Sequence, residues 1–521
     1  MTHQESRLQI TGAVALAVGV VMVVFSGGCT MGPDPERPVT AADASETYVY
    51  ADQQEVAVLP DSSTEWPADT LWWKRFGDPT TAELVEMALE ANPDLYVAAA
   101  RVLEAEALLD AAGGARLPQI GYGLTANRSR NSFVLPEIGR INPESTTYGT
   151  SLDIAWQADL FGKLKRSQQS SWANLLAEEA ARDGVLHMVV ASVVRARVQV
   201  ATLERALDIS RSIQSSWEST TATVERRYRN GLVGAVDFYL ARENLASVRA
   251  AGAVLEGSVT TSRNALDVLV GRRPGLGSPL PKTLPELPSF EPVPLGLPAE
   301  LLDRRPDLRQ SEMRLASATY GVGVAIADLY PSLSLTASGG TASDTLNNLI
   351  SSETLVYNLL ANLVGPLFTG GQRRAAVDAA QARTEQAAGS YAGAVLQALR
   401  EVEDALVMEA TVREQLQYND QRVADARSAN RIAKDRYQRG VETLLYVLET
   451  ERRFRLAEEA WISTQADLWN VRIDLFLALG GDWEPADPPG IPPESAALTL
   501  PHSAGASPES RAPNPESNEV S

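Results

Sequence analysis

The chain has 521 residues and a net charge of −20, with 46 lysine and arginine residues against 66 aspartate and glutamate residues. This acidic balance argues against a nucleic acid as partner, because neutralising a phosphate backbone requires an excess of cations. With only one cysteine and three histidines, an intrachain disulfide and a His/Cys metal cluster are excluded. We therefore expect neither a metal nor another cofactor.

The N-terminal residues 1–28 have the features of a lipoprotein signal peptide. An apolar run from Gly12 to Phe25 is too short to span a bilayer as a helix, and small residues separate it from Cys29. We predict that Cys29 becomes the lipidated first residue, although Ser26 stands where such signals usually carry leucine. Thr30 at the next position favours export to the outer membrane. Ordinary signal cleavage with an incidental free cysteine is the alternative.

Residues 29–80 form the lipid-anchored N-terminal segment, which we expect to be mostly irregular. Its aromatic residues are expected to anchor it by packing against the rest of the protein: Trp66, Trp72, Trp73 and Phe76. From Thr81 to Arg116 apolar residues recur at helical spacing. Asn92-Pro93 predicts a break in that helix, since proline is favoured in the first turn of a new one.

Two segments replace the helical period with a period of two, and we predict a β-hairpin in each, at about 118–159 and about 331–366. Their strands are apolar on one side and small or polar on the other, which is typical of transmembrane barrel strands. A soluble half-buried sheet would have the same pattern. The four strand patterns span 119–126, 148–158, 332–338 and 355–364.

Two long tracts without proline, 162–231 and 371–440, predict very long helices. A helix of some 65 residues is on the order of 100 Å long and must pack against partners along its length. Apolar residues in and after these tracts recur every seven positions, as in Trp461, Leu468 and Leu475. This repeat is typical of coiled-coil packing.

The chain is a tandem duplication. RYRNG at 227–231 is repeated as RYQRG at 436–440, and NPDL at 92–95 is repeated as RPDL at 305–308. Each copy of a motif lies at an equivalent place among the predicted helices and strands. The duplication therefore indicates two halves of one body.

The domain organisation follows from this duplication. The first structural repeat spans 81–273 and the second spans 299–483, joined by a proline-rich linker at 274–298. Residues 484–521 are rich in proline, serine and glutamate and lack apolar periodicity, so we expect a disordered tail.

Four strands per chain are too few to close a barrel, and lipid does not tolerate open sheet edges. Copies of the chain must therefore share one barrel, with eight strands in a dimer or 12 in a trimer. The long helices would extend the same cylinder away from the membrane. Such an assembly is a conduit with a polar lumen.

Several motifs together resemble the TolC-like outer-membrane efflux proteins, in the lipid-anchored branch that serves RND-type multidrug pumps. The resemblance covers about residues 29 to 483. It implies a homotrimer with a 12-stranded barrel in the bacterial outer membrane and a periplasmic coiled-coil tunnel. It also implies docking to an inner-membrane RND-type pump through a periplasmic adaptor protein. The motifs are Cys29 with GPDPERP, LWWKRFGDP, NPDL and RPDL, PLFTGG, RYQRGVETLLYVLE and LALGGDW.

The resemblance also implies a periplasmic gate where the helices after Gly440 converge. Its apolar constriction falls on Leu445, and its carboxylate and arginine fall on Glu449 and Arg452. Their spacing lets all three share one helix face. The alternative is that Leu445 is part of the coiled-coil core and that Glu449 and Arg452 form a solvated ion pair worth less than about 1 kcal/mol.

Other classes of function fit the sequence less well. A periplasmic or surface-anchored coiled-coil adaptor or scaffold lipoprotein would share the long helices but would lack the four strands. An enzyme is not expected, because carboxylate pairs such as Glu401 and Glu403 lie on charged helix faces beside no nucleophile or metal ligands.

Overall fold

The structure is a computed structural model. The predicted signal peptide 1–28, the predicted lipidation site Cys29, most of the 274–298 linker and the 484–521 tail lie outside the residues that it describes. The described residues are 30–43, 47–51, 71–135, 137, 139–277, 280–281 and 298–481.

The helices of the two halves match in length. The two longest, α4 and α8, have 67 residues each, α5 and α9 have 35 each, and α3 and α7 have 22 each. The predicted long helices are confirmed as α4 and α8. The predicted break at Asn92-Pro93 is confirmed as well, because the Asn92 side chain caps the start of α3 by accepting a hydrogen bond from Asp94 N at 2.8 Å. The bounds are α3 Pro93–Gly114, α4 Lys163–Arg229, α5 Ala235–Leu269, α7 Pro306–Ala327, α8 Gln372–Gln438 and α9 Leu444–Ala478.

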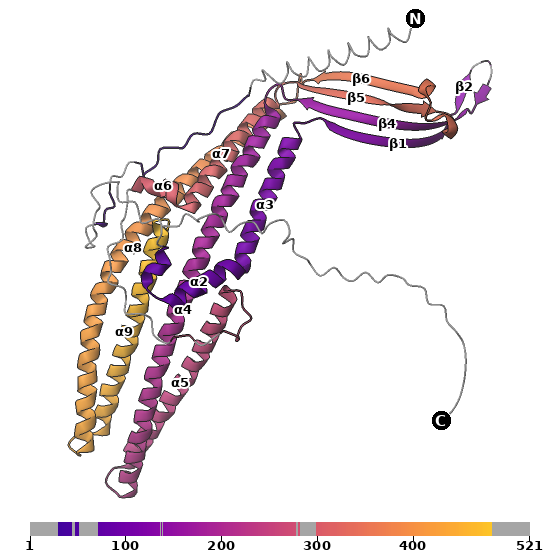
Figure 1. The fold of residues 1–521 in the computed structure, drawn as a ribbon. Helices are drawn as coiled ribbons and strands as arrows, with labels where there is room; N and C mark the ends of the chain where they lie inside the picture. Colours follow the sequence, from indigo (N-terminus) through magenta and orange to yellow (C-terminus); the bar gives the residue numbers. More distant parts are fainter. Residues whose placement is uncertain are drawn as a thin grey trace, which may run out of the picture. The chain divides into compact units, whose positions relative to one another are not determined.

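The four predicted strands form one antiparallel sheet at one end of the helices (Figure 1). The strand order is β1-β4-β5-β6, so β1 and β6 are its free edges. The strands are β1 Gln119–Arg130, β4 Glu144–Ala158, β5 Ser332–Ser343 and β6 Leu355–Val364. A short ladder of β2 Phe133–Leu135 with β3 Gly139–Ile141 extends the first hairpin and was not predicted from the sequence.

The sheet has large apolar side chains that are exposed. On β1, Ile120, Tyr122 and Leu124 share one face and are all exposed, and every residue of β6 is exposed. A soluble sheet would bury such a face against a second layer. This exposure is what a lipid-facing barrel segment requires.

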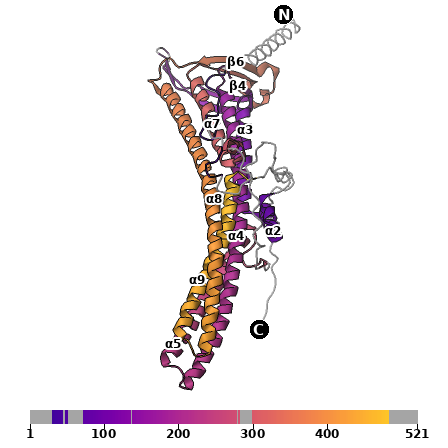
Figure 2. The same ribbon diagram turned by 90° about the vertical axis from the view of Figure 1, so that its left-hand side faces the viewer.

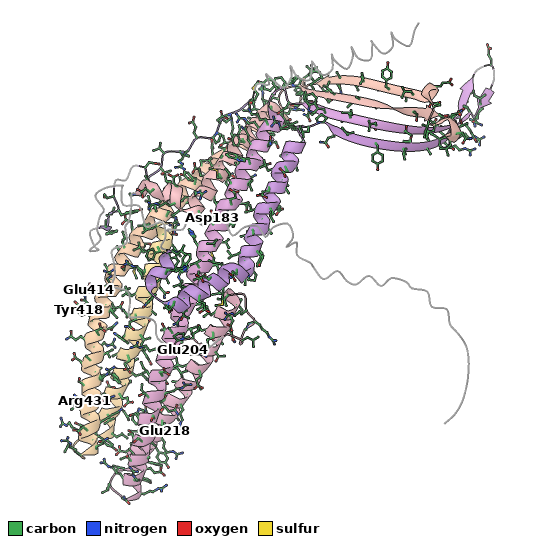
Figure 3. All side chains as sticks on the ribbon, in the orientation of Figure 1. Asp183, Glu204, Glu218, Glu414, Tyr418 and Arg431 are labelled. Atoms are coloured by element: carbon green, nitrogen blue, oxygen red, sulfur yellow. The ribbon has the colours of Figure 1, made fainter. Side chains whose placement is uncertain are left out.

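The helices pair as two long antiparallel hairpins, α4 with α5 and α8 with α9, which run side by side (Figure 2). Two ion pairs join α4 to α5 from the Glu204 and Glu218 carboxylates, which are two heptads apart and whose places along α4 appear in Figure 3. Glu204 pairs with Arg263, and Glu218 lies 2.8 Å from the Arg249 guanidinium. Near the sheet, α7 lies between α4 and α8, and α3 packs on the other side of α4.

Aromatic residues of the N-terminal part pack against this body. The predicted aromatic anchors Trp72, Trp73 and Phe76 are buried, and Phe76 packs on Trp469 of α9 with ring centroids 4.6 Å apart. Trp66 lies outside the described residues. The shorter helices are η2 Trp72–Phe76, α2 Pro79–Ala91, η3 Pro298–Glu300 and α6 Leu301–Arg304, with η4 Leu346–Asn348 and η5 Ser352–Thr354 in the connection between β5 and β6.

The segment that follows Cys29 is held at the junction of sheet and helices. The buried Arg166 of α4 donates to the Met31 and Gly32 carbonyls at 3.0 and 2.9 Å and to the Asp34 carboxylate at 2.6 Å. A Cβ atom on Gly32 would lie 2.4 Å from the Cα of Gly323. The segment therefore fits closely against α4 and α7, and only glycine is small enough at this contact.

Candidate functional site at the helical tips

Both helical hairpins turn on a glycine. Gly440 has φ 78° and Gly231 has φ 71°, in the left-handed region that side chains with a Cβ rarely adopt. Val441 N donates to the Arg436 carbonyl at 3.0 Å, which satisfies a backbone acceptor at the end of α8. The two repeated motifs, RYRNG and RYQRG, therefore end α4 and α8 and form the turns of the two hairpins.

A buried cluster joins the two hairpins close to these turns. Residues of α4 and α5 meet residues of α8 and α9 in it, so the tip of one chain has a continuous apolar core. Leu444 at the start of α9 is 1% exposed. The members of the cluster are Ile213, Trp217, Val224, Ala241, Val248, Ala433, Tyr437, Leu444 and Val447.

Polar contacts cross between the same two hairpins. The Arg227 guanidinium of α4 donates to the Tyr437 and Gln438 carbonyls at 3.2 and 2.7 Å, at the negative end of the α8 dipole. It also lies over the Tyr437 ring, 5.2 Å from the centroid. Lys434 of α8 reaches Ser216 of α4 at 2.9 Å and Glu451 of α9 at 2.6 Å.

Leu445 lies outside this core. Its side chain is 67% exposed, whereas its neighbours Leu444 and Val447 are buried between the hairpins. The alternative that Leu445 belongs to the coiled-coil core is therefore wrong for the single chain. An exposed leucine next to a buried one means that α9 presents a second apolar position away from its own hairpin.

Glu449 and Arg452 form the expected ion pair, and a second arginine joins them. Arg452 donates to both carboxylate oxygens of Glu449 at 3.1 Å, and Arg453 Nε donates to one of them at 2.7 Å. Hydrogen bonds from Arg452 and then Arg453 lower the pKa of Glu449 to about 2. Arg453 was missed in the sequence, although glutamate four residues before arginine is a recognised helical pair.

The first hairpin reproduces only part of this arrangement. Val236 takes the position of Leu445, since each is the second residue of its helix, and it is also exposed. The positions of Glu449 and Arg452 are taken by Leu240 and Glu243. The carboxylate with its two arginines therefore belongs to the second hairpin alone.

Comparisons with known proteins agree over both halves of the chain. The family described as outer membrane efflux protein matches residues 84–272 and 297–481. The outer membrane protein OprJ of Pseudomonas aeruginosa is 30% identical over 90% of this chain and 96% of its own length. The toluene efflux pump outer membrane protein TtgF of Pseudomonas putida is 29% identical over 90% of this chain and 97% of its own length.

Solved structures have the same fold. The outer-membrane channel OprN aligns with a TM-score of 0.78 and 30% identity, over 88% of this chain and 100% of its own. A structure of CusC, from work on folding and transmembrane channel formation, aligns with a TM-score of 0.75 and 26% identity, over 87% of this chain and 100% of its own.

Proposed function

The chain belongs to the outer membrane efflux protein family, and from this we infer that it is the outer-membrane channel component of an efflux system. This is a family of transport channels. The observation that carries the inference is an open four-stranded sheet with exposed apolar side chains above long paired helices. A coiled-coil adaptor or scaffold without its own channel would have no need of that sheet.

The working channel is a homotrimer in the bacterial outer membrane. Each chain supplies four strands with free edges at β1 and β6, and lipid requires those edges to be paired. Three copies give a closed barrel of 12 strands, continued by the helices into the periplasm. A periplasmic adaptor protein and an inner-membrane RND-type pump are the partners that would deliver the cargo to this tube.

The closed state is held at the tips of the second hairpins. The exposed Leu445 side chains would meet around the axis as an apolar ring. The Glu449 carboxylates would come close together one turn further on, and like charges at close range disfavour one another unless cations lie beside them. Arg452 and Arg453 supply those cations, as the low pKa of Glu449 indicates.

Conductance in planar bilayers tests the channel and its gate together. The wild type should form channels of low conductance. Leu445→Ser removes apolar contact at the ring, and Arg452→Ala removes one of the cations that offset the repulsion between carboxylates. Each change should raise the single-channel conductance several-fold and admit a bulky antibiotic, with a normal yield of trimer.

Arg455→Ala is the matched control, because Arg455 is on α9 but pairs with Glu459 at 3.9 Å instead of Glu449. A lower trimer yield with unchanged conductance would assign Leu445 and Arg452 to helix packing and contradict the gate. Absence of any conductance, in the wild type and in both gate variants, would contradict the channel itself.

A further inference from the structure

One face of the sheet carries an apolar band with an aromatic residue at each end. Within the band, Tyr122 of β1 lies opposite Leu152 of β4, and both side chains are exposed. Tyr148 and Trp156 lie on the same face of β4 at the two ends of the band, separated by roughly 27 Å of strand. A transmembrane barrel has an outward-facing apolar band of about 25 Å between two aromatic girdles. This face is therefore the one that would contact lipid.

Two arginines continue this face of β1 beyond the apolar band. Because side chains alternate between the faces of a strand, Arg128 and Arg130 lie on the same face as Tyr122. Both come after Ala126, which lies opposite Tyr148 at the end of the band. Their side chains are 75% and 66% exposed. The lipid-facing surface of β1 therefore changes from apolar to basic where the hydrocarbon interior of the membrane should end.

The arginines are at the end of β1 that is remote from the helices. The strand begins at Gln119, shortly after α3 ends at Gly114, and runs to the far end of the sheet (Figure 1). The proposed function places the helices in the periplasm. Arg128 and Arg130 therefore belong to the outer side of the outer membrane, at the level of the lipid head groups.

Both guanidinium groups share one carboxylate of the neighbouring strand. Arg128 Nη2 donates to Glu144 Oε2 at 2.9 Å, and Arg130 Nη1 lies 3.7 Å from Glu144 Oε1. The side chain of Glu144 is 46% exposed, so water screens both ion pairs and each is weak. Two positive charges meet one negative charge, which leaves one positive charge unbalanced. Because both guanidiniums reach one carboxylate, both can also reach one phosphate group, which arginine binds in the same forked geometry.

The second hairpin has no equivalent of this arginine pair. Residues 332–364 contain no lysine or arginine, and their only charged residues are Asp344 and Glu353. The first hairpin also contains Glu137 and Arg140, whose charges cancel. The unbalanced positive charge of Arg128 and Arg130 therefore occurs once in each copy of the chain and is not a general property of the sheet's outer end.

From this we propose that Arg128 and Arg130 bind a phosphate group in the head group of an anionic lipid in the outer leaflet. The proposal rests on the proposed function, because it requires the sheet to cross the outer membrane. The ligand is a lipid, since the apolar band next to the arginines on the same face would contact its acyl chains. Basic side chains at a membrane surface recognise anionic head groups in this way. Closing the barrel pairs the backbone edge of β1 and leaves this face free.

The binding test uses the full-length protein in detergent, with diphosphoryl lipid A, a membrane lipid that has two phosphate groups, as the probe. Native mass spectrometry measures the dissociation constant. Arg128→Ala with Arg130→Ala should weaken binding by about tenfold or more, because charge-assisted hydrogen bonds to the phosphate are lost. Arg128→Lys with Arg130→Lys should recover part of the affinity, since the charges remain and the forked geometry does not. Glu144→Gln should tighten binding several-fold, because it frees both guanidiniums.

Arg211→Ala with Arg249→Ala is the matched control, because it removes the same charge from the α4–α5 hairpin. These two arginines also pair with glutamates, at 2.9 and 2.8 Å. The control variant should bind lipid A as tightly as the wild type does. Lipid A without its phosphate groups should bind the wild type and the double alanine variant equally. Displacement of lipid A by an equal concentration of inorganic phosphate would show that the arginines bind a free anion, and would contradict the lipid.

The outcomes separate the lipid site from the channel. The wild type and the double alanine variant should have the same single-channel conductance in planar bilayers. If both conduct and both bind lipid A equally tightly, the lipid site is wrong and the channel stands. Weaker binding by Glu144→Gln would also contradict the site. If the wild type does not conduct at all, the proposed function fails, and the lipid site that depends on it fails as well.

Discussion

At the scale of single residues, Glu449 is bound by two arginines, and this determines how the candidate gate should respond to pH. Its pKa is lowered to about 2 from an ordinary value of 4.5, first by Arg452 and then by Arg453. Because the pKa is lowered in the folded state, the ion pair stabilises the folded tip at pH values above the ordinary pKa of 4.5. That contribution is lost as the pH falls from 4.5 toward 2.

Replacing both Arg452 and Arg453 with alanine should therefore bring the Glu449 titration into an accessible range. Without the two cations its pKa should return toward 4.5, so the carboxylates stay charged at neutral pH and become neutral near pH 4. We expect a high single-channel conductance at neutral pH that falls as the solution is acidified. The wild type should show no such change over that range, and a double variant whose conductance is independent of pH would contradict this role of Glu449.

At the scale of the elements, the two hairpins have ion pairs of opposite polarity at equivalent positions. Glu218 of α4 pairs with Arg249 of α5, whereas Arg427 of α8 pairs with Glu458 of α9. If α4 paired with α9 instead of α5, Glu218 would face Glu458, and the two arginines would likewise meet between α8 and α5. The reversal therefore favours the observed pairing over the exchanged one, as charge patterns do in coiled coils.

Leu444→Ala and Leu445→Ala are a matched pair that tests which leucine holds the hairpins together. Leu444 is buried in the cluster, so its truncation should lower the free energy of unfolding by about 2–5 kcal/mol. Leu445 is exposed in the single chain, and its truncation should change local stability by about 0.5 kcal/mol or less. Hydrogen exchange should reveal lost protection at the ends of both hairpins for Leu444→Ala only. Equal loss for both variants would mean that Leu445 also packs in that core.

At the scale of the whole molecule, the N-terminal segment would connect the proposed lipid anchor to the channel. The Cα of Thr30 lies 2.8 Å from where a Cβ on Gly162 would be, at the boundary between β4 and α4. That boundary is where the membrane should end and the periplasm begin. A lipid on the preceding residue, Cys29, would therefore meet the inner surface of the outer membrane without further chain.

Intact mass spectrometry tests the lipid anchor. The mature protein should begin at Cys29 and carry acyl groups, and an unmodified N-terminus or cleavage elsewhere would contradict the anchor. Cys29→Ala should leave the fold intact, because the Arg166 contacts hold the N-terminal segment without the lipid. A normal yield of trimer from this variant would agree with that expectation.

The duplication, the long helices, the glycines that end them and the four strands could all be predicted from the amino-acid sequence. These features are local: a period of two or seven, a run without proline, or a glycine at a turn is encoded in neighbouring residues. Features that depend on residues far apart in the sequence became visible only in the folded chain. Both Leu444 and Leu445 fit an apolar seam, and only packing against the α4–α5 hairpin decides that the first is buried and the second exposed. Likewise, the Arg166 contact with residues 31–34 joins segments more than 130 residues apart, because folding brings together side chains whose separation no local pattern records.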